Sequence, residues 1–194
     1  MTGFVRALEQ IRWLLDDVGA VVNGRWWRWY TCWFSSGIGV VVAYRLCRAG
    51  HLALGPVWAA LRIVAAPVAL ALRPWWGRCE VHYGAEIGPG LHILHPGLGV
   101  VVSKHAVLGS RVTLTGGNCI GGRRRLARGD LVIGDQVILG ANAVVLGPVR
   151  VGNRVRIGAG AVVVSDIPDD SSVVGVPAKA VGLADGPDDA AVAP

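Results

Sequence analysis

The chain has 194 residues, a formal net charge of +6 and a hydrophobic content of 53%, which suffices for one substantial domain and an accessory segment. Its four cysteines show neither the spacing of a zinc site nor a paired framework, which argues against a zinc finger and a disulfide-stapled scaffold. We expect reduced, mostly buried thiols in a cytosolic protein. The cysteines are Cys32, Cys47, Cys79 and Cys119.

Residues 1–77 are predicted to be helical and carry an uneven charge. Residues 1–78 contain nine arginines but only three acidic residues, and all eight tryptophans precede residue 77. Arginine and tryptophan concentrated in one apolar segment are typical of a membrane interface rather than of a nucleic-acid surface. We therefore expect no nucleic-acid partner.

Two apolar stretches bear on membrane insertion. Trp29–Tyr44 is uncharged but shorter than the ~20 residues that span a bilayer. Ala49–Leu72 is long enough but contains Arg62, Pro56 and Pro67. The arginine costs ~2.5–3.5 kcal/mol near mid-span, and the prolines kink the helix. The sequence favours helices that lie on the membrane or pack as a hairpin; a soluble helical cap at an oligomer interface and a spanning segment are the alternatives.

Acidic residues interrupt the start of the chain at Glu9, Asp16 and Asp17, so we expect no signal peptide. The prediction is a cytoplasmic protein, with peripheral attachment to the inner face of the cell membrane as an option.

A six-residue repeat dominates the second half of the chain. Such a period fits neither a helix nor simple strand alternation, and it is typical of a hexapeptide β-helix in which three units close one triangular coil. We predict an all-β, left-handed parallel β-helix over residues 78–182, preceded by the helical segment and followed by a disordered tail at 183–194. The handedness comes from the known architecture, not from the period. One series is Leu131, Val137, Ala143, Val149, Val155, Ala161, Ile167 and Val173; the other is Ile133, Leu139, Val145, Val151, Ile157 and Val163; upstream members are Ile87, Ile93, Val102, Leu108, Leu114 and Ile120.

The repeat is interrupted twice, and breaks in a regular scaffold are where function tends to lie. Ile93 and Val102 are nine residues apart where six are expected, and the break contains His95. Ile120 and Ile133 are thirteen residues apart, and the insertion extrudes the arginine-rich residues 122–130.

His95 is the candidate general base, because an unperturbed imidazole titrates near 6.5. Glu80 precedes it by slightly less than one coil of three repeat units. At that spacing Glu80 can lie beneath His95 and orient the ring, as in other histidine–carboxylate pairs. From spacing alone, a surface histidine and an unrelated glutamate remain the alternative.

The stretch from Glu80 to His95 resembles the active-site segment of serine acetyltransferases, in which an acidic residue, an apolar residue and His-Pro precede Ile-Gly-x-Gly and Asp-His. Further similarity lies in Val100–Gly109, in Ile120–Gly122 and in Val174–Lys179, a signature of hexapeptide acetyltransferases. The similarity covers residues 80–182. The apolar lead-in looks more like that of serine-acetyltransferase-like enzymes of bacterial exopolysaccharide or capsule synthesis.

The resemblance implies that His95 is the base and Glu80 its carboxylate partner. Two acceptor contacts of the family differ here: Leu94 stands where an acidic residue precedes the catalytic histidine, and Asp130 aligns with a second histidine. These changes place serine as the acceptor in doubt. The candidate acceptor contacts are Leu94, Asp130, His82 and His92.

The resemblance also implies that acetyl-CoA binds in a groove between subunits of a homotrimer. Small residues let the pantetheine arm approach the backbone, and an arginine of the loop pairs with the CoA phosphates; an acidic acceptor or plain solvation are alternatives for that arginine run. The candidate donor contacts are Gly121, Gly122, Ala141, Ala159, Arg123 and Lys179.

We expect no metal. His92, His95 and His105 invite comparison with hexapeptide carbonic anhydrases, but their spacings of 3 and 10 differ from the spacing in those enzymes.

The sequence therefore predicts an acetyl-CoA-dependent O-acetyltransferase. We expect its acceptor to be a sugar or glycan hydroxyl, because the basic, tryptophan-rich segment would hold the enzyme at a membrane. L-serine is the alternative acceptor, and a non-catalytic β-helix scaffold or a zinc hydratase are alternatives of other classes.

Overall fold

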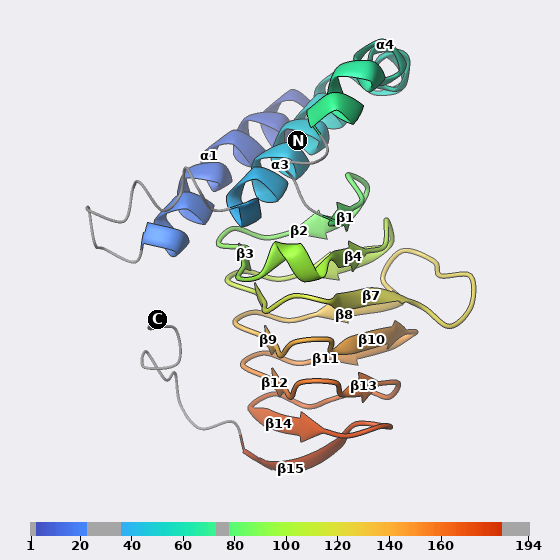
Figure 1. The fold of residues 1–194 in the computed structure, drawn as a ribbon. Coiled ribbons are helices and arrows are strands. Elements are labelled where there is room, and N and C mark those ends of the chain that lie inside the picture. The colour runs from blue at the N-terminus through green and yellow to red at the C-terminus, as the bar shows by residue number, and fades with distance from the viewer. Residues whose placement is uncertain (1–2, 23–35, 73–77, 184–194) are drawn as a thin grey trace.

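The computed structural model describes residues 3–22, 36–72 and 78–183, in which helices pack on the first coil of a β-helix (Figure 1). The described helices are α1 (Gly3–Val22), α3 (Ser36–Leu54) and α4 (Pro56–Leu72). α3 ends at Gly55, which has a φ of 54° and donates its N–H to the His51 carbonyl at 2.9 Å. A glycine in this left-handed conformation ends a helix at low cost, and Pro56 then begins the next helix.

Parallel strands form three sheets, one for each face of a triangular prism. The first sheet contains β1 (Glu80–Val81), β4 (Val100–Val102), β7 (Asn118–Gly122), β10 (Val144–Gly147) and β13 (Val162–Val163). The second contains β2 (Glu86–Ile87), β5 (Ala106–Leu108), β8 (Leu131–Ile133) and β11 (Val149–Val151). The third contains β3 (His92–Ile93), β6 (Thr113–Leu114), β9 (Ile138–Leu139), β12 (Arg156–Ile157), β14 (Ser171–Val174) and the antiparallel β15 (Lys179–Leu183).

The two six-residue series form the interior column of the prism. From Leu131 onward, every member of both series is buried, with an exposed fraction of at most 7%. The upstream members from Ile87 to Ile120 are buried as well. Each buried aliphatic side chain contributes roughly 1.5–3 kcal/mol, so a repeated column supports this long, narrow core. The predicted β-helix is confirmed.

The two breaks in the repeat lengthen individual coils. Val101 pairs with Cys119, which follows it by one regular coil of three repeat units, whereas Glu80 pairs with Val101 across a coil that is three residues longer. The short 3-10 helix η3 (Pro96–Leu98) accounts for the longer first coil. In the sheet, Val101 is therefore the residue that stacks on Glu80. The second break leaves the prism between β7 and β8 as a loop (Figure 1).

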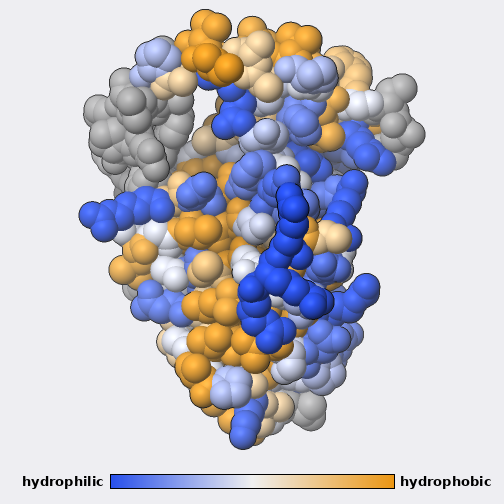
Figure 2. All heavy atoms as spheres, turned by 90° about the vertical axis from the view of Figure 1, so that its right-hand side faces the viewer, coloured by the Kyte–Doolittle hydropathy of each residue, from blue (hydrophilic) through white to orange (hydrophobic). Residues whose placement is uncertain are grey.

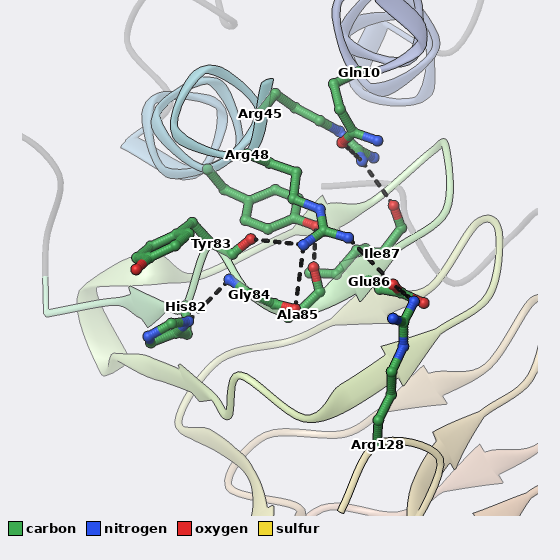
Figure 3. Close-up of polar contacts among 11 residues, drawn as sticks. Gln10, Arg45, Arg48, His82, Tyr83, Gly84, Ala85, Glu86, Ile87 and Arg128 are labelled. Carbon is green, nitrogen blue, oxygen red and sulfur yellow. Dashed lines mark hydrogen bonds and ion pairs between the residues drawn. The ribbon is translucent and has the colours of Figure 1, made fainter. Parts of the chain in front are cut away.

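A buried ion pair joins the helices to the first coil. Arg45 of α3 and Asp17 of α1 are both fully buried, and Arg45 Nε lies 2.8 Å from an Asp17 carboxylate oxygen. Arg45 also donates to Gln10 and to the Ile87 carbonyl (Figure 3), and to the Gly88 carbonyl. Asp17 in turn accepts the N–H groups of Gly90 and Leu91, each at 2.8 Å. α1 and α3 thereby cover the open end of the prism.

Gly37–Leu54 of α3 is the one described helical stretch long and apolar enough to cross a membrane, and a third of it is buried. The start of the Trp29–Tyr44 stretch lies outside the described residues. The apolar character of α3 serves its packing against α1 and the first coil.

The described cysteines Cys47, Cys79 and Cys119 are unpaired and half-buried, while Cys32 lies outside the described residues. Burial raises the pKa of the Cys47 and Cys79 thiols, which lowers their reactivity. Of the predicted tail, Leu183 belongs to β15 and residues 184–194 lie outside the described part of the chain.

Candidate active site

His95 lies at the corner where the chain leaves the third sheet and turns into η3. Its backbone N–H donates to the Thr115 carbonyl at 2.9 Å, and its carbonyl accepts the Leu98 N–H at 3.2 Å. These contacts fix the backbone, whereas the side chain is exposed. Within the described residues the imidazole has no hydrogen-bond or ion-pair partner, so both ring nitrogens are open to a ligand.

Gly116 of the next coil passes directly beneath His95. It has a φ of 135°, and a Cβ at this position would lie 3.2 Å from the His95 Cβ. A side chain would therefore meet both backbone strain and the histidine. The glycine keeps the next coil close under the candidate base.

Two predicted donor contacts, Ala141 and Ala159, lie in later coils at the same corner of the prism as His95. Gly116 accepts the Asn142 N–H at 2.8 Å, and in the next coil Ala141 accepts the Gly160 N–H at 2.8 Å. Ala141 is half-buried and Ala159 is exposed. The structure thus brings Ala141 and Ala159 onto the same edge as His95.

The remaining predicted small contacts, Gly121 and Gly122, lie at the far end of β7, where the extruded loop begins. A Cβ on Gly121 would meet nothing within 4 Å, so the surface is open there. A Cβ on Gly122 would lie 2.6 Å from the Arg124 carbonyl oxygen and from Leu126 Cγ. The loop itself therefore requires glycine at position 122.

Glu80 is an exposed residue at the start of β1. The two segments approach each other, since Cys79 Sγ lies 3.4 Å from the Pro96 carbonyl. Within the described residues, however, no hydrogen bond joins the side chains of Glu80 and His95. The orienting role of Glu80 stays a prediction.

His82 lies in the first coil beside Tyr83, whose carbonyl accepts a hydrogen bond from Arg48 of α3 (Figure 3). Its ring stacks on Tyr83 at 4.5 Å, and its Nδ1 accepts the Gly84 N–H at 2.9 Å. Burial lowers the pKa of His82, and the charges of Arg62 and Lys104 lower it further against the opposing effect of Glu80. The neutral ring is therefore favoured, which suits its role as a hydrogen-bond acceptor.

The other predicted acceptor contacts have different surroundings. Leu94 is half-buried next to His95, and His92 is half-buried in β3. The Asp130 carboxylate accepts the Ala127 N–H at 2.8 Å, and its carbonyl accepts the Val149 N–H at 2.8 Å. Asp130 therefore closes the extruded loop.

The predicted cationic donor contacts lie far apart. Arg123 is exposed at the start of the loop and donates its N–H to the Gly147 carbonyl at 3.1 Å. Lys179 is exposed at the start of β15. That strand is the fifth along the third sheet from β3, which is about 24 Å at the usual strand spacing. The structure does not bring Lys179 near His95. Among the described residues, no group of three histidine, cysteine or acidic side chains gathers as a metal site.

The triangular prism of hexapeptide coils, with an exposed histidine in a coil break, places this chain in the class of hexapeptide-repeat transferases. The family described as "Bacterial transferase hexapeptide (six repeats)" matches residues 130–165. The serine acetyltransferase of Helicobacter pylori strain J99 is 37% identical over 155 residues, which cover 79% of this chain and 86% of that protein. The serine acetyltransferase of Synechocystis is 43% identical over 103 residues, 53% of this chain and 41% of that protein.

Solved structures agree with these relatives. The crystal structure of Neisseria gonorrhoeae serine acetyltransferase superposes with a TM-score of 0.77 at 29% identity, over 95% of this chain and 69% of that one. Soybean serine acetyltransferase gives a TM-score of 0.64 at 31% identity, over 87% of this chain and 67% of that one. The chain belongs to the serine acetyltransferase family and is an acetyl-CoA-dependent O-acyltransferase.

The expected link to the exopolysaccharide branch is not supported. Because the match to the Neisseria enzyme covers 95% of the chain, it includes most of residues 1–77 as well as the β-helix. The helical lead-in therefore has counterparts in serine acetyltransferases, contrary to the expectation from its apolar composition.

Proposed function

We propose that this enzyme transfers the acetyl group of acetyl-CoA to the hydroxyl of L-serine, with His95 as the general base. The relatives support serine over the sugar acceptor that the sequence favoured. One of them, the Neisseria gonorrhoeae enzyme solved in complex with serine, is 30% identical and superposes with a TM-score of 0.73. The observation that carries the proposal is the exposed His95 in the coil break, on one edge with Ala141 and Ala159.

In this mechanism His95 takes the proton of the acceptor hydroxyl as its oxygen attacks the thioester carbonyl. The new C–O bond forms, the C–S bond breaks, and the imidazolium returns the proton to the leaving thiolate. Backbone N–H groups near the corner glycines would stabilise the charge that develops on the carbonyl oxygen. Ala141 and Ala159 leave room for the pantetheine arm along the same edge.

His95→Ala tests the chemistry. A positioned base contributes ~10²–10⁴-fold, so turnover should fall by that factor. The thermal midpoint should not change, because the imidazole is exposed and makes no contact that the structure describes. Release of the CoA thiol with L-serine, followed spectrophotometrically, measures turnover. Near-normal turnover in His95→Ala would overturn the mechanism.

A specific observation keeps the sugar hydroxyl as a second candidate acceptor. Leu94 supplies no charge beside His95, and Asp130 is engaged in closing its own loop, so two contacts for an amino-acid acceptor are weakened. Thioester consumption with L-serine and with a panel of sugars, on the same preparation, separates the two. Stimulation by sugars alone would favour the second candidate, and hydrolysis without stimulation by either would favour a scaffold.

The proposed homotrimer is supported by the outward face of the first sheet. Its outward positions stack as Val101, Cys119, Val144 and Val162, and Val101 is 44% exposed. An apolar outer face on a parallel sheet favours a covering partner. A donor groove between subunits requires such a contact. A monomeric mass by light scattering would contradict this proposal.

Attachment to a membrane surface is a further proposal, and α4 supports it. The side chains of Val57, Leu61, Ile63 and Val64 are between 46% and 79% exposed. Figure 2 shows hydrophobic residues gathered at the end of the molecule where α4 lies. Wild-type protein should sediment with anionic lipid vesicles, and Ile63→Glu should reduce this binding. Equal sedimentation of the two proteins would count against α4 as the attachment site.

A further inference from the structure

A cleft separates the helices from the second sheet, away from the edge that holds His95. Two adjoining cavities of about 450 and 380 Å³ share the lining residues Arg6, Arg48, Leu52, Glu86, Val107 and Arg128. Because these walls are common to both cavities, the two form one continuous cleft. Each volume lies in the range of sites for small molecules.

Cations from three separate elements line this cleft. Arg6 comes from α1, Arg48 from α3 and Arg128 from the extruded loop, and Lys104 lines the smaller cavity. In that smaller cavity Glu86 is the one acidic residue of the lining. With Glu9 in the larger cavity, the cleft holds four cationic and two acidic side chains, and such an excess of positive charge attracts an anion.

Two of the arginines meet at Glu86, as Figure 3 shows. Arg48 lies 3.3 Å from a Glu86 carboxylate oxygen and also donates to the carbonyls of Tyr83 and Gly84 at 3.2 and 3.3 Å. Its side chain is only 12% exposed, so it is held in place before any ligand arrives. Arg128 pairs with the same carboxylate oxygen, but its side chain is 70% exposed. Glu86 thus occupies the position of an anion between two guanidinium groups.

His82 neighbours the cleft residue Gly84 and has cationic side chains around it. After burial, the charges of Arg62 and Lys104 are the next causes that lower the pKa of His82. A Cβ on Gly84, which lines the cleft, would lie 3.1 Å from Lys104 Cβ and 3.0 Å from His82 Nδ1. Lys104 is therefore packed against the Gly84 wall of the cleft.

The two ends of the cleft differ in character. The larger cavity adds the apolar walls of Trp13, Ile87 and Leu108, together with the polar side chains of Glu9 and Gln10. The smaller cavity adds His51, Lys104 and His105. A ligand that fills both ends has an anionic group at one end and an apolar or aromatic part at the other.

We propose that this cleft is a binding site for a phosphate group, either free or carried by a small phosphate ester. The phosphate lies against Lys104, Arg6 and Arg128, and Arg128 exchanges Glu86 for the phosphate oxygens. Arginine matches phosphate bidentately and lysine adds a point charge, which together suit a dianion better than a single carboxylate. The site is separate from the predicted donor contacts Ala141 and Ala159, which lie on the edge of His95.

Isothermal titration of the full chain at low, constant ionic strength tests the site, with inorganic phosphate and phenyl phosphate as probes. Lys104→Gln should weaken the binding of both probes about tenfold, the effect of losing one charge-assisted hydrogen bond. Lys104 is exposed, so this variant should fold normally. Glu86→Gln should have the opposite effect and tighten binding roughly two- to fivefold, because it removes the competing exposed carboxylate. Tighter binding of phenyl phosphate than of phosphate would identify an ester as the ligand, and equal binding a free phosphate.

Arg154→Gln is the matched control, since it also removes one positive charge but from an exposed pair with Asp170 near the other end of the prism. It should leave the affinity unchanged. Equal affinities in wild type, Lys104→Gln and Glu86→Gln would overturn the site. Displacement of the probe by CoA, with loss of binding in Arg123→Gln instead, would assign the phosphate to the predicted donor groove and also overturn it. Neither result depends on which acceptor the enzyme acetylates.

Discussion

Asp17→Asn should detach the helices from the prism. The Asp17 and Arg45 side chains are 1% and 0% exposed, so the variant leaves a buried guanidinium without its counter-ion. Asparagine offers one acceptor oxygen, whereas Asp17 accepts from Arg45 with both oxygens and from Gly90 and Leu91 with one of them. Breaking a buried ion pair in this way costs about 3–5 kcal/mol, or roughly 6–20 °C in Tm for a chain of this length.

Urea unfolding with two probes measures this effect. All eight tryptophans precede residue 77, so their fluorescence reports on residues 1–77, whereas far-UV circular dichroism includes the β-helix. In Asp17→Asn the fluorescence transition should move to lower urea than the dichroism transition, because the helices lose their attachment before the repeated core unfolds.

Two further variants make the test specific. In Asp17→Asn/Arg45→Met the unpaired charge is removed, so the destabilisation should be smaller than the sum of the two single losses. Asp170→Asn breaks an ion pair whose side chains are about half exposed and should change neither transition. A fluorescence midpoint equal to that of wild type in Asp17→Asn would refute the attachment role.

Two other predictions concern pH and the corner glycines. The pKa of His82 is lowered, chiefly by burial. Below about pH 6.5 the unfolded chain therefore binds a proton at this histidine more readily than the folded chain, and the stability decreases as the pH is lowered. His82→Gln should flatten the dependence of the unfolding midpoint between about pH 5 and 7, and an unchanged slope would contradict it. Gly122→Ala should destabilise the fold by about 1–3 kcal/mol because its Cβ meets the loop. Gly121→Ala should keep stability and raise only the KM for acetyl-CoA; equal thermal midpoints for these two variants would refute the distinction.

The repeated core was predictable because its pattern depends only on residues that are close in the sequence. Each member of the series that begins at Leu131 and Ile133 needs only its neighbours six residues away, and all of them are buried as expected. The breaks were visible for the same reason, as departures from a fixed period. They located His95 and the extruded loop without any knowledge of tertiary contacts.

Contacts between distant segments were not predictable. Nothing in the sequence distinguishes Asp17 from Asp16 or Arg45 from Arg48, and the pairing becomes evident only when α1 and α3 lie side by side. The lengthened first coil was not predicted either: the 3-10 turn after His95 adds three residues and brings Val101 over Glu80. The cluster around Glu86 was missed as well, since Arg48 and Arg128 come from distant parts of the chain, one from α3 and the other from the extruded loop.

β15 has a consequence for how copies of this molecule behave in a crowded solution. A stack of parallel strands leaves unpaired backbone groups at its last rung, where another stack can add and begin a fibre. Here β15 reverses direction and pairs with β14, so that Ser171 faces Leu183 and Val174 faces Lys179. The reversed strand presents the wrong polarity to an incoming rung and carries an exposed lysine, so growth at that end of the third sheet is discouraged.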